Sequence, residues 1–357
     1  MDREAEKSFD RAVENGKPTR PKRLHRVLVG FLVWIVPHLA AADDSKWIAG
    51  AKKEKQLMIY GTMQIGDMDP ILEKFRANCP FLKVEYFRAG GEKLAEKLYT
   101  EVKAGKYFSD VQLQSGVEML QLKAQGLTTA YDSPQRAFIR EGLKDKEGHW
   151  TAVYLSIEAL GYNTQLIPKE QVPRTYEDLL NPRWKGNLGL DSSNVEWYII
   201  QLHNMGEERG REFMKKLVRQ DVGVRRGHTL GAQLLTAGEY SLLLDFRTNH
   251  FEKFKSEGAP VGIVALGPLI PIPPVSIALS PKPPHPNAGK LFIDFLLSKE
   301  GQDLVKRVTQ REVARADVAP TSALIKERGL KGTDWTPYIK RYREYETEFR
   351  DLFLKGN

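Results

Sequence analysis

The chain of 357 residues contains a single cysteine, Cys79. One cysteine cannot form an intramolecular disulfide, and it excludes metal centres built from several thiolates. A chain this poor in thiols fits a bacterial periplasm, where unpaired cysteines would be oxidised. Cys79 precedes Pro80 in a connection between a predicted helix and a predicted strand, and we interpret it as a small packing residue.

The sequence also lacks a long apolar run. The longest candidate, residues 27–36, holds about ten residues, whereas a helix needs ~20 to span a bilayer comfortably. A polar leader and a basic stretch precede this run, and Ala40, Ala41 and Ala42 follow it. That order is typical of a secretory signal peptide. We predict that residues 1–42 are a signal peptide with a long n-region, cleaved after Ala42, and that the mature protein is periplasmic. An uncleaved anchor is the alternative.

Motifs for catalysis and for nucleic-acid binding are absent as well. The sequence contains no Walker loop, no Gly-x-Ser-x-Gly and no His-Glu-x-x-His. It also has no helix-turn-helix, zinc-finger or aromatic–basic RNA signature. We therefore predict a binding protein rather than an enzyme, with no cofactor and no nucleic-acid partner. The net charge of +8 weakly favours an anionic ligand or an anionic membrane surface.

Strand-like and helix-like segments alternate along the chain from residue 56 onward. Residues 56–61, 82–87 and 110–113 have strand patterns, and a segment of helical spacing follows each one, the first opening at Asp69-Pro70. Such alternation predicts parallel βαβ units. After the extended run 151–162 comes a second series, with predicted strands 187–190, 222–224, 240–244 and 261–265 and predicted helices 196–203, 210–220 and 230–237.

Two extended segments separate the two series. Residues 268–274 contain four prolines, so this segment is a stiff crossover rather than a central strand. We predict an α/β protein of two lobes, with lobe I formed by residues 43–153 and 275–357, including a helical tail, and lobe II by residues 154–274. Ligands of open α/β sheets bind outside the carboxyl ends of the strands, which here would face each other.

Several phrases, in order, resemble a known family. QLMIYG and DPILEKF (residues 56–61 and 69–75) are similar to the first strand and helix of type 2 periplasmic binding proteins. YEDLLNPRWKGNLGL (176–190) and SKEGQDLV (298–305) resemble the ferric-iron-binding branch of extracellular solute-binding proteins. The resemblance implies the two-lobed type 2 fold with two interlobe crossovers. It also implies a small-molecule ligand held between the lobes and delivery to the permease of an ABC importer in the inner membrane.

The same comparison disfavours iron. Iron-binding members present a tyrosine pair after the strand that follows the "AGE" turn, and residues 244–250 contain no tyrosine here. The usual histidine after the first strand is replaced by Met63-Gln64, and a glutamate after the third strand is replaced near Gln114-Ser115. Fe(III) prefers hard oxygen donors, so their loss argues against direct ferric binding. A ferric carrier with atypical ligands remains the alternative, its candidate donors being Glu92, Asp245 and His250.

Candidate ligand contacts in lobe I follow its predicted strands. Each is a neutral hydrogen-bonding group that could equally be an ordinary loop residue: Thr62, Gln64, Gln114 and Ser115. Gly90-Gly91 open a helix, where free N–H groups and the helix dipole could hold an anion. An ordinary glycine turn explains this pair equally well.

The candidate ligand contacts in lobe II include charged side chains. Arg247 follows a predicted strand and is our best single ligand contact. A guanidinium group can bind a carboxylate or a phosphate through two parallel hydrogen bonds. One of Arg225 and Arg226 could join Arg247. Asp191 and Ser192 could also contact a ligand, although with Ser193 they fit a helix N-cap better. Tyr154 and Trp197 could stack on a ligand, but core packing is the commoner fate of aromatics.

We therefore predict a monomer that closes about its crossovers on a small anion, organic or phosphorylated. The alternative partner is a chemoreceptor or kinase, to which a ligand sensor would dock instead of a permease.

Overall fold

The structure is a computed structural model that describes residues 45–331 and 333–355. The predicted signal peptide, residues 1–42, lies outside the described residues. Within those residues, no helix combines the length and the apolar character needed to cross a membrane.

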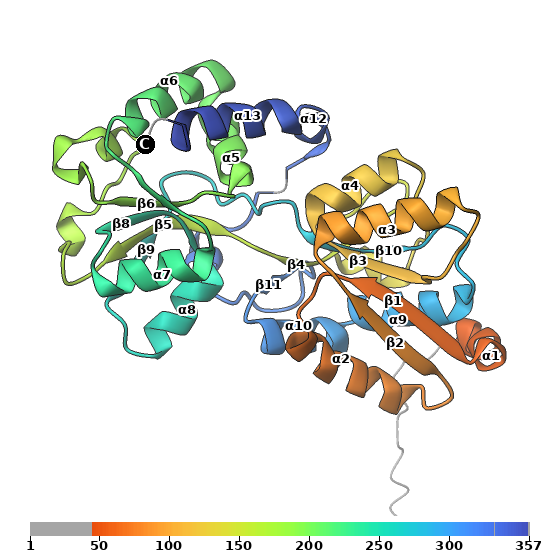
Figure 1. The fold of residues 1–357 in the computed structure, drawn as a ribbon. Coiled ribbons are helices and arrows are strands. Elements are labelled where there is room, and N and C mark those ends of the chain that lie inside the picture. Colours follow the sequence, from red (N-terminus) through yellow and green to blue (C-terminus); the bar gives the residue numbers. More distant parts are fainter. Residues whose placement is uncertain (1–44, 332, 356–357) are drawn as a thin grey trace, which may run out of the picture. The chain divides into compact units, whose positions relative to one another are not determined.

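The first of two sheets has six strands in the order β11-β4-β10-β3-β1-β2 (Figure 1). β1 pairs in parallel with β2 and with β3, as the alternating sequence predicts, because a helix returns the chain each time. The other pairings are antiparallel. The strands are β1 (Gln56–Gly61), β2 (Lys83–Arg88), β3 (Val111–Gln114), β4 (Thr151–Leu155), β10 (Val275–Leu279) and β11 (Glu312–Val313).

Helices cover both faces of this sheet and bury its apolar side chains. In Figure 1, α3 and α4 lie on one face and the remaining helices on the other. Phe75 packs edge-on against Phe292 at 5.0 Å between ring centroids, joining two of the helices over Leu57 and Ile59. The helices are α1 (Ser45–Glu54), α2 (Ile65–Asn78), α3 (Gly91–Lys103), α4 (Gly116–Ala124), α9 (Pro286–Leu297) and α10 (Lys299–Thr309).

Helix α2 begins four residues before the predicted start at Asp69-Pro70. The N–H groups of Asp67 and Met68 donate to the carbonyl of Gln64, so the first turn forms ahead of the proline. Pro70 then lies inside the helix. A proline this close to the N-terminus removes a single hydrogen bond, which explains why it does not mark the boundary.

The second sheet has five strands in the order β7-β6-β8-β5-β9. β6 pairs in parallel with β7 and β8, and β5 runs antiparallel to β8 and β9. Its strands are β5 (Glu158–Asn163), β6 (Leu188–Asp191), β7 (Gly223–Arg225), β8 (Leu242–Arg247) and β9 (Val261–Val264). Its helices are α5 (Val195–Met205), α6 (Glu207–Val218), α7 (His228–Ala237) and α8 (Thr248–Ser256).

Two segments carry the chain between the sheets. The extended run 151–162 divides into β4 of the first sheet and β5 of the second, joined by Ser156 and Ile157. The proline-rich return lies beside it, because Ile157 bridges to Pro271 and the N–H of Ile272 donates to Ser156 at 3.0 Å. The two crossovers therefore support each other through backbone hydrogen bonds.

The C-terminal tail contains α11 (Ala323–Arg328), α12 (Thr336–Lys340) and α13 (Tyr342–Phe353). Tyr345, Phe349 and Phe353 form the buried face of α13 and pack against α5 and α6 of the second sheet. The sequence prediction grouped this tail with lobe I. An amphipathic pattern shows that a helix buries one face, but not against which sheet, so the pattern alone could not place it.

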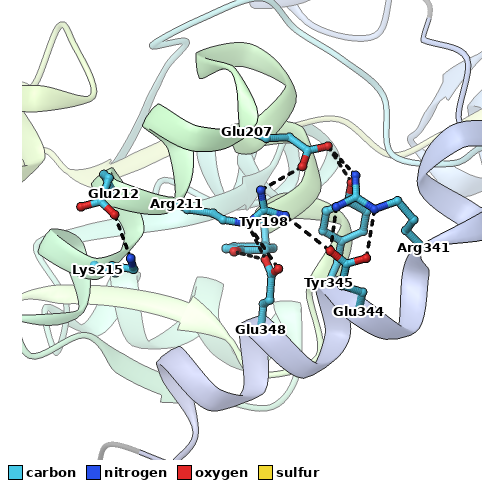
Figure 2. A network of polar contacts seen from close by, with 9 residues as sticks. All are labelled: Tyr198, Glu207, Arg211, Glu212, Lys215, Arg341, Glu344, Tyr345 and Glu348. Carbon is cyan, nitrogen blue, oxygen red and sulfur yellow. Dashed lines mark hydrogen bonds and ion pairs between the residues drawn. The ribbon is translucent and has the colours of Figure 1, made fainter.

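Polar contacts surround this apolar seam (Figure 2). Arg211 of α6 donates to Glu348 at 3.0 Å and to Glu207 at 2.9 Å. Arg341 donates to the same Glu207 at 2.8 Å, and the hydroxyl of Tyr345 does so at 2.9 Å. Glu207 thus accepts from both α6 and the tail, and this fixes the register of α13 on α6.

Candidate functional site

Ionisable side chains gather where the strands of the second sheet end. Asp191 closes β6, and Asp245 and Arg247 lie at the end of β8. The two aspartates are almost fully enclosed, at 4% and 2% exposure. His228 and His250 lie in the first turns of α7 and α8, the helices that follow β7 and β8. The carboxyl ends of parallel strands thus bring five chemically active side chains to one edge.

Backbone and amide donors hold the carboxylates in place. Oδ1 of Asp191 accepts from the N–H and hydroxyl of Ser193 at 2.9 and 2.8 Å, and Oδ2 accepts from the N–H of Gly227 at 3.1 Å. Oδ2 of Asp245 accepts from Asn194 at 2.8 Å. Asn194 also caps α5 by accepting from the N–H of Trp197 at 3.0 Å. The predicted cap at residues 191–193 is therefore one residue further on, at Asn194.

Burial controls the protonation of this cluster. It raises the pKa of Asp245 to about 6, and the neighbouring charge of Asp191 acts in the same direction. Burial lowers the pKa of His228 to about 2, with the charge of Arg247 adding to it. His228 is therefore neutral near pH 7, and its contacts of 3.5 Å with the two aspartates are not ion pairs.

The charges of two arginines, Arg247 of the second sheet and Arg311 from the segment before β11 of the first, act on the same side chains. Nε of Arg247 donates to Glu158 at 3.2 Å. Arg311, just before β11, stacks its guanidinium 5.1 Å from the ring centre of Tyr154. Nε of Arg311 and Nδ1 of His250 are buried and have no hydrogen-bond partner among the described residues. Burial lowers the pKa of His250 to about 4, with the charges of Arg247 and then Arg311 adding to the effect.

The other arginines predicted in lobe II do not reach this cluster. Arg225 and Arg226 are exposed, and Arg225 donates to its neighbour's carbonyl, that of Val224, at 2.8 Å. Sequence reasoning also missed three members of the site, His228, Glu158 and Arg311. His228 follows a strand, which is the signal that identified Arg247, whereas nothing local marks Arg311.

The polar residues predicted after the strands of the first sheet have mixed environments. Thr62 bonds back to Leu113, and Gln64 is the exposed residue before α2. Gln114 is buried with both amide atoms unpaired, and Ser115 precedes α4. Gly90 and Gly91 do open a helix, but a Cβ on Gly91 would lie 2.5 Å from a carboxylate oxygen of Glu118. That carboxylate disfavours the anion predicted at this helix start.

Glu118 belongs to a groove of about 1010 Å³ lined by residues of α3, α4, α5 and α13 and by Ile272 and Pro273. Its walls are acidic, with carboxylates at Glu92, Glu96, Glu118, Glu196 and Glu346. Burial raises the pKa of Glu118, and the charge of Glu92 raises it further. Glu92 therefore lies with these glutamates, whereas Asp245 lies with Asp191 and His228, so the donors of the ferric alternative do not form one group.

We expect Glu118→Gln to stabilise the protein near pH 8. Because the folded pKa of this acid is raised, its ionised form costs stability, and the cost appears as pH rises above the pKa of the unfolded chain. Thermal unfolding should show a higher Tm for the variant near pH 8 and no difference near pH 4. Glu96→Gln, in an exposed carboxylate of the same groove, is the control and should change neither Tm. An equal effect of Glu118→Gln at both pH values would contradict this account.

Comparison with known proteins places the chain in a family. A profile described as "Bacterial extracellular solute-binding protein" matches residues 110–335, more than half of the chain. An uncharacterized protein of Haemophilus influenzae is 27% identical over 175 residues, 46% of this chain and 50% of the relative. The chain thus spans about half the length of the curated relative it matches.

Solved structures share the fold at low identity. Iron-bound HitA from Pseudomonas aeruginosa has a TM-score of 0.71 at 18% identity, over 84% of this chain and 99% of that chain. The periplasmic binding protein AfuA from Actinobacillus pleuropneumoniae, with exogenous fructose-6-phosphate bound, has a TM-score of 0.67 at 21% identity over the same shares. The predicted α/β periplasmic-binding-protein fold is confirmed, and the chain belongs to the bacterial extracellular solute-binding proteins.

Proposed function

We propose that this protein is the periplasmic substrate-binding component of an ABC importer and that its cargo is a small anion bearing phosphate or carboxylate groups. The observation that carries the ligand class is a pair of buried nitrogens, Nε of Arg311 and Nδ1 of His250, without a hydrogen-bond partner among the described residues. The charges of Arg247 and Arg311 both act on this imidazole. Buried polar atoms are almost always hydrogen-bonded. Two unpaired nitrogens in a region that carries two guanidinium charges therefore indicate that a bound hydrogen-bond acceptor is missing. Phosphate and carboxylate oxygens are the acceptors that arginine prefers.

The charges near Arg247 also favour an anionic ligand. Glu158 pairs with Arg247, but burial raises the pKa of Glu158 to about 8, so near pH 7 this carboxyl only partly offsets the guanidinium. Arg311 has no ion-pair partner among the contacts of the described residues. A bound anion would therefore complete the charge balance. AfuA, which shares the fold, has fructose-6-phosphate bound, and this adds support.

Arg311 and Arg247 come from different sheets, which suggests how capture would work. A ligand held by both would tie the two sheets together across the crossovers at residues 156–157 and 265–274, as in hinge closure. The ligand-bound form would then dock on a permease in the inner membrane. Iron-bound HitA is equally similar in fold, but the donors named for ferric ion here lie apart, so a ferric carrier is the weaker proposal.

Native mass spectrometry of the purified protein tests the proposal, read against a denatured control. We expect a phosphate- or carboxylate-bearing mass to co-purify, or to bind on addition of fructose 6-phosphate or citrate. Arg247→Ala should abolish that adduct, and Arg225→Ala, which removes an exposed arginine, should retain it. The absence of any anion adduct, or an undiminished adduct on Arg247→Ala, would overturn the proposed ligand class.

A further inference from the structure

Three metal-ligating side chains converge in the second sheet in a way that the proposed anion site does not use. Nδ1 of His228 lies 3.5 Å from Oδ2 of Asp191 and 3.5 Å from Oδ2 of Asp245. One donor atom from each residue lies within 4.8 Å of the other two. The strand ends of β6 and β8 and the first turn of α7 supply the three groups.

From this geometry we propose that Asp191, His228 and Asp245 bind a first-row divalent metal cation. A distance of 3.5 Å is too long for an N–H···O hydrogen bond, whose usual range is about 2.7–3.2 Å. It matches the spacing between two ligands of a tetrahedral metal ion, about 3.4 Å for bonds of about 2.0–2.1 Å. Both imidazole-to-carboxylate distances therefore fit a metal ion between the groups better than a direct hydrogen bond.

The imidazole gives a second, independent indication. Nδ1 of His228 is inaccessible to solvent and has no hydrogen-bond partner among the described residues, although it faces two carboxylates. Such a nitrogen is costly unless something pairs with it. A neutral imidazole is the form that ligates metals, and a cation between it and the two oxygens would satisfy all three atoms.

The surroundings resemble those of built metal sites. Ligating carboxylates are usually oriented by further hydrogen bonds, and here Asp191 accepts from Gly227 and Ser193, while Asp245 accepts from Asn194. Both carboxylates are almost fully enclosed, which keeps their attraction for a cation strong. Arg247 lies nearby and opposes a cation, but its own charge faces Glu158.

The types of ligand atom limit which metal ions the site can bind. Calcium and magnesium take oxygen ligands almost exclusively, so an imidazole disfavours them. Two carboxylate oxygens and one imidazole nitrogen suit Mn²⁺, Fe²⁺ or Zn²⁺, with at least one further position left for water or another ligand. The site shares no residue with the proposed anion contacts Arg247, Arg311 and His250, so either proposal can fail alone.

Metal content and thermal unfolding of the full chain test the site. The protein is incubated with Zn²⁺ or Mn²⁺ in separate samples, desalted and analysed by inductively coupled plasma mass spectrometry. We expect about one metal ion per chain and a higher Tm with metal. His228→Gln should lower metal affinity by about 10- to 100-fold or more, because losing a ligand costs at least as much as losing a supporting contact. Asp245→Asn should do the same.

The matched control is His250→Gln, which removes the other histidine whose buried Nδ1 has no partner among the described residues, and it should retain the metal. Arg247→Ala should also retain it, which separates this test from that of the anion site. His228 is partly exposed and starts a helix, so its variant should fold, and circular dichroism checks this. No metal on the parent protein, or equal metal on parent and His228→Gln, would overturn the proposal and leave a trapped water as the occupant.

Discussion

An Arg311→Ala protein is expected to bind fructose 6-phosphate about 10- to 150-fold more weakly than the parent protein. That range converts the ~1.5–3 kcal/mol typical of a hydrogen bond to a charged group. Arg311 is singled out because its buried Nε has no partner among the described residues, and because its guanidinium lies over the ring of Tyr154. A preoriented guanidinium loses little freedom when it binds, so its removal should appear mainly as faster ligand release.

Isothermal titration calorimetry of the two proteins measures the effect. Arg307→Ala is the matched control, because it removes an exposed arginine from α10, the helix that leads to Arg311. Binding by the Arg307 variant should be unchanged. If Arg311→Ala binds as tightly as the parent while Arg247→Ala does not, the first sheet contributes no charge to the ligand site, and anion capture belongs to the second sheet alone.

Phe349→Ala is expected to destabilise the fold by about 3–5 kcal/mol, the usual cost of removing a buried phenylalanine ring. Phe349 is 1% exposed and contacts the rings of Tyr198 and Phe353 at 6.1 and 5.2 Å between centroids. Tyr198 is held by its hydrogen bond to Glu348 at 2.8 Å, which restrains this ring from moving into the space.

Urea unfolding followed by tryptophan fluorescence reports this loss, since Trp197 packs in the same cluster. Arg350→Ala, at the exposed neighbouring position of α13, should leave the unfolding midpoint within experimental error. A midpoint for Phe349→Ala equal to that of the parent would mean that α13 does not pack on α5 as described.

The order of strands and helices was largely predictable because each strand buries a continuous or alternating apolar row. Residues 56–61 were predicted with the bounds that β1 has in the structure. Helix α2 was predicted to start late because a proline near a helix start can occupy either the first position of the helix or a position inside it. The docking of α13 was not predictable, because its apolar face fits any complementary surface.

The residues of the candidate site also differ in how far the sequence could predict them. Arg247 was predicted because it directly follows a strand, and in this fold strand ends carry the ligand contacts. Arg311 follows a helix and reaches the site only through the pairing of β11 with β4. Position after a strand therefore identified Arg247 but also pointed to Arg225, which is exposed, and it could not identify Arg311, which is placed by a partner strand.

The position of β10 between β3 and β4 has a consequence for the order in which the protein assembles. A ribosome delivers β3 and β4 long before β10, because the whole second sheet lies between β4 and β10 in the chain. The first sheet thus stays divided until most of the polypeptide exists, and the face of α5 and α6 stays uncovered until α13 emerges. Contacts so distant in sequence close slowly. The first sheet should therefore be the last part of the nascent chain to be completed, after the second sheet has been synthesised in full.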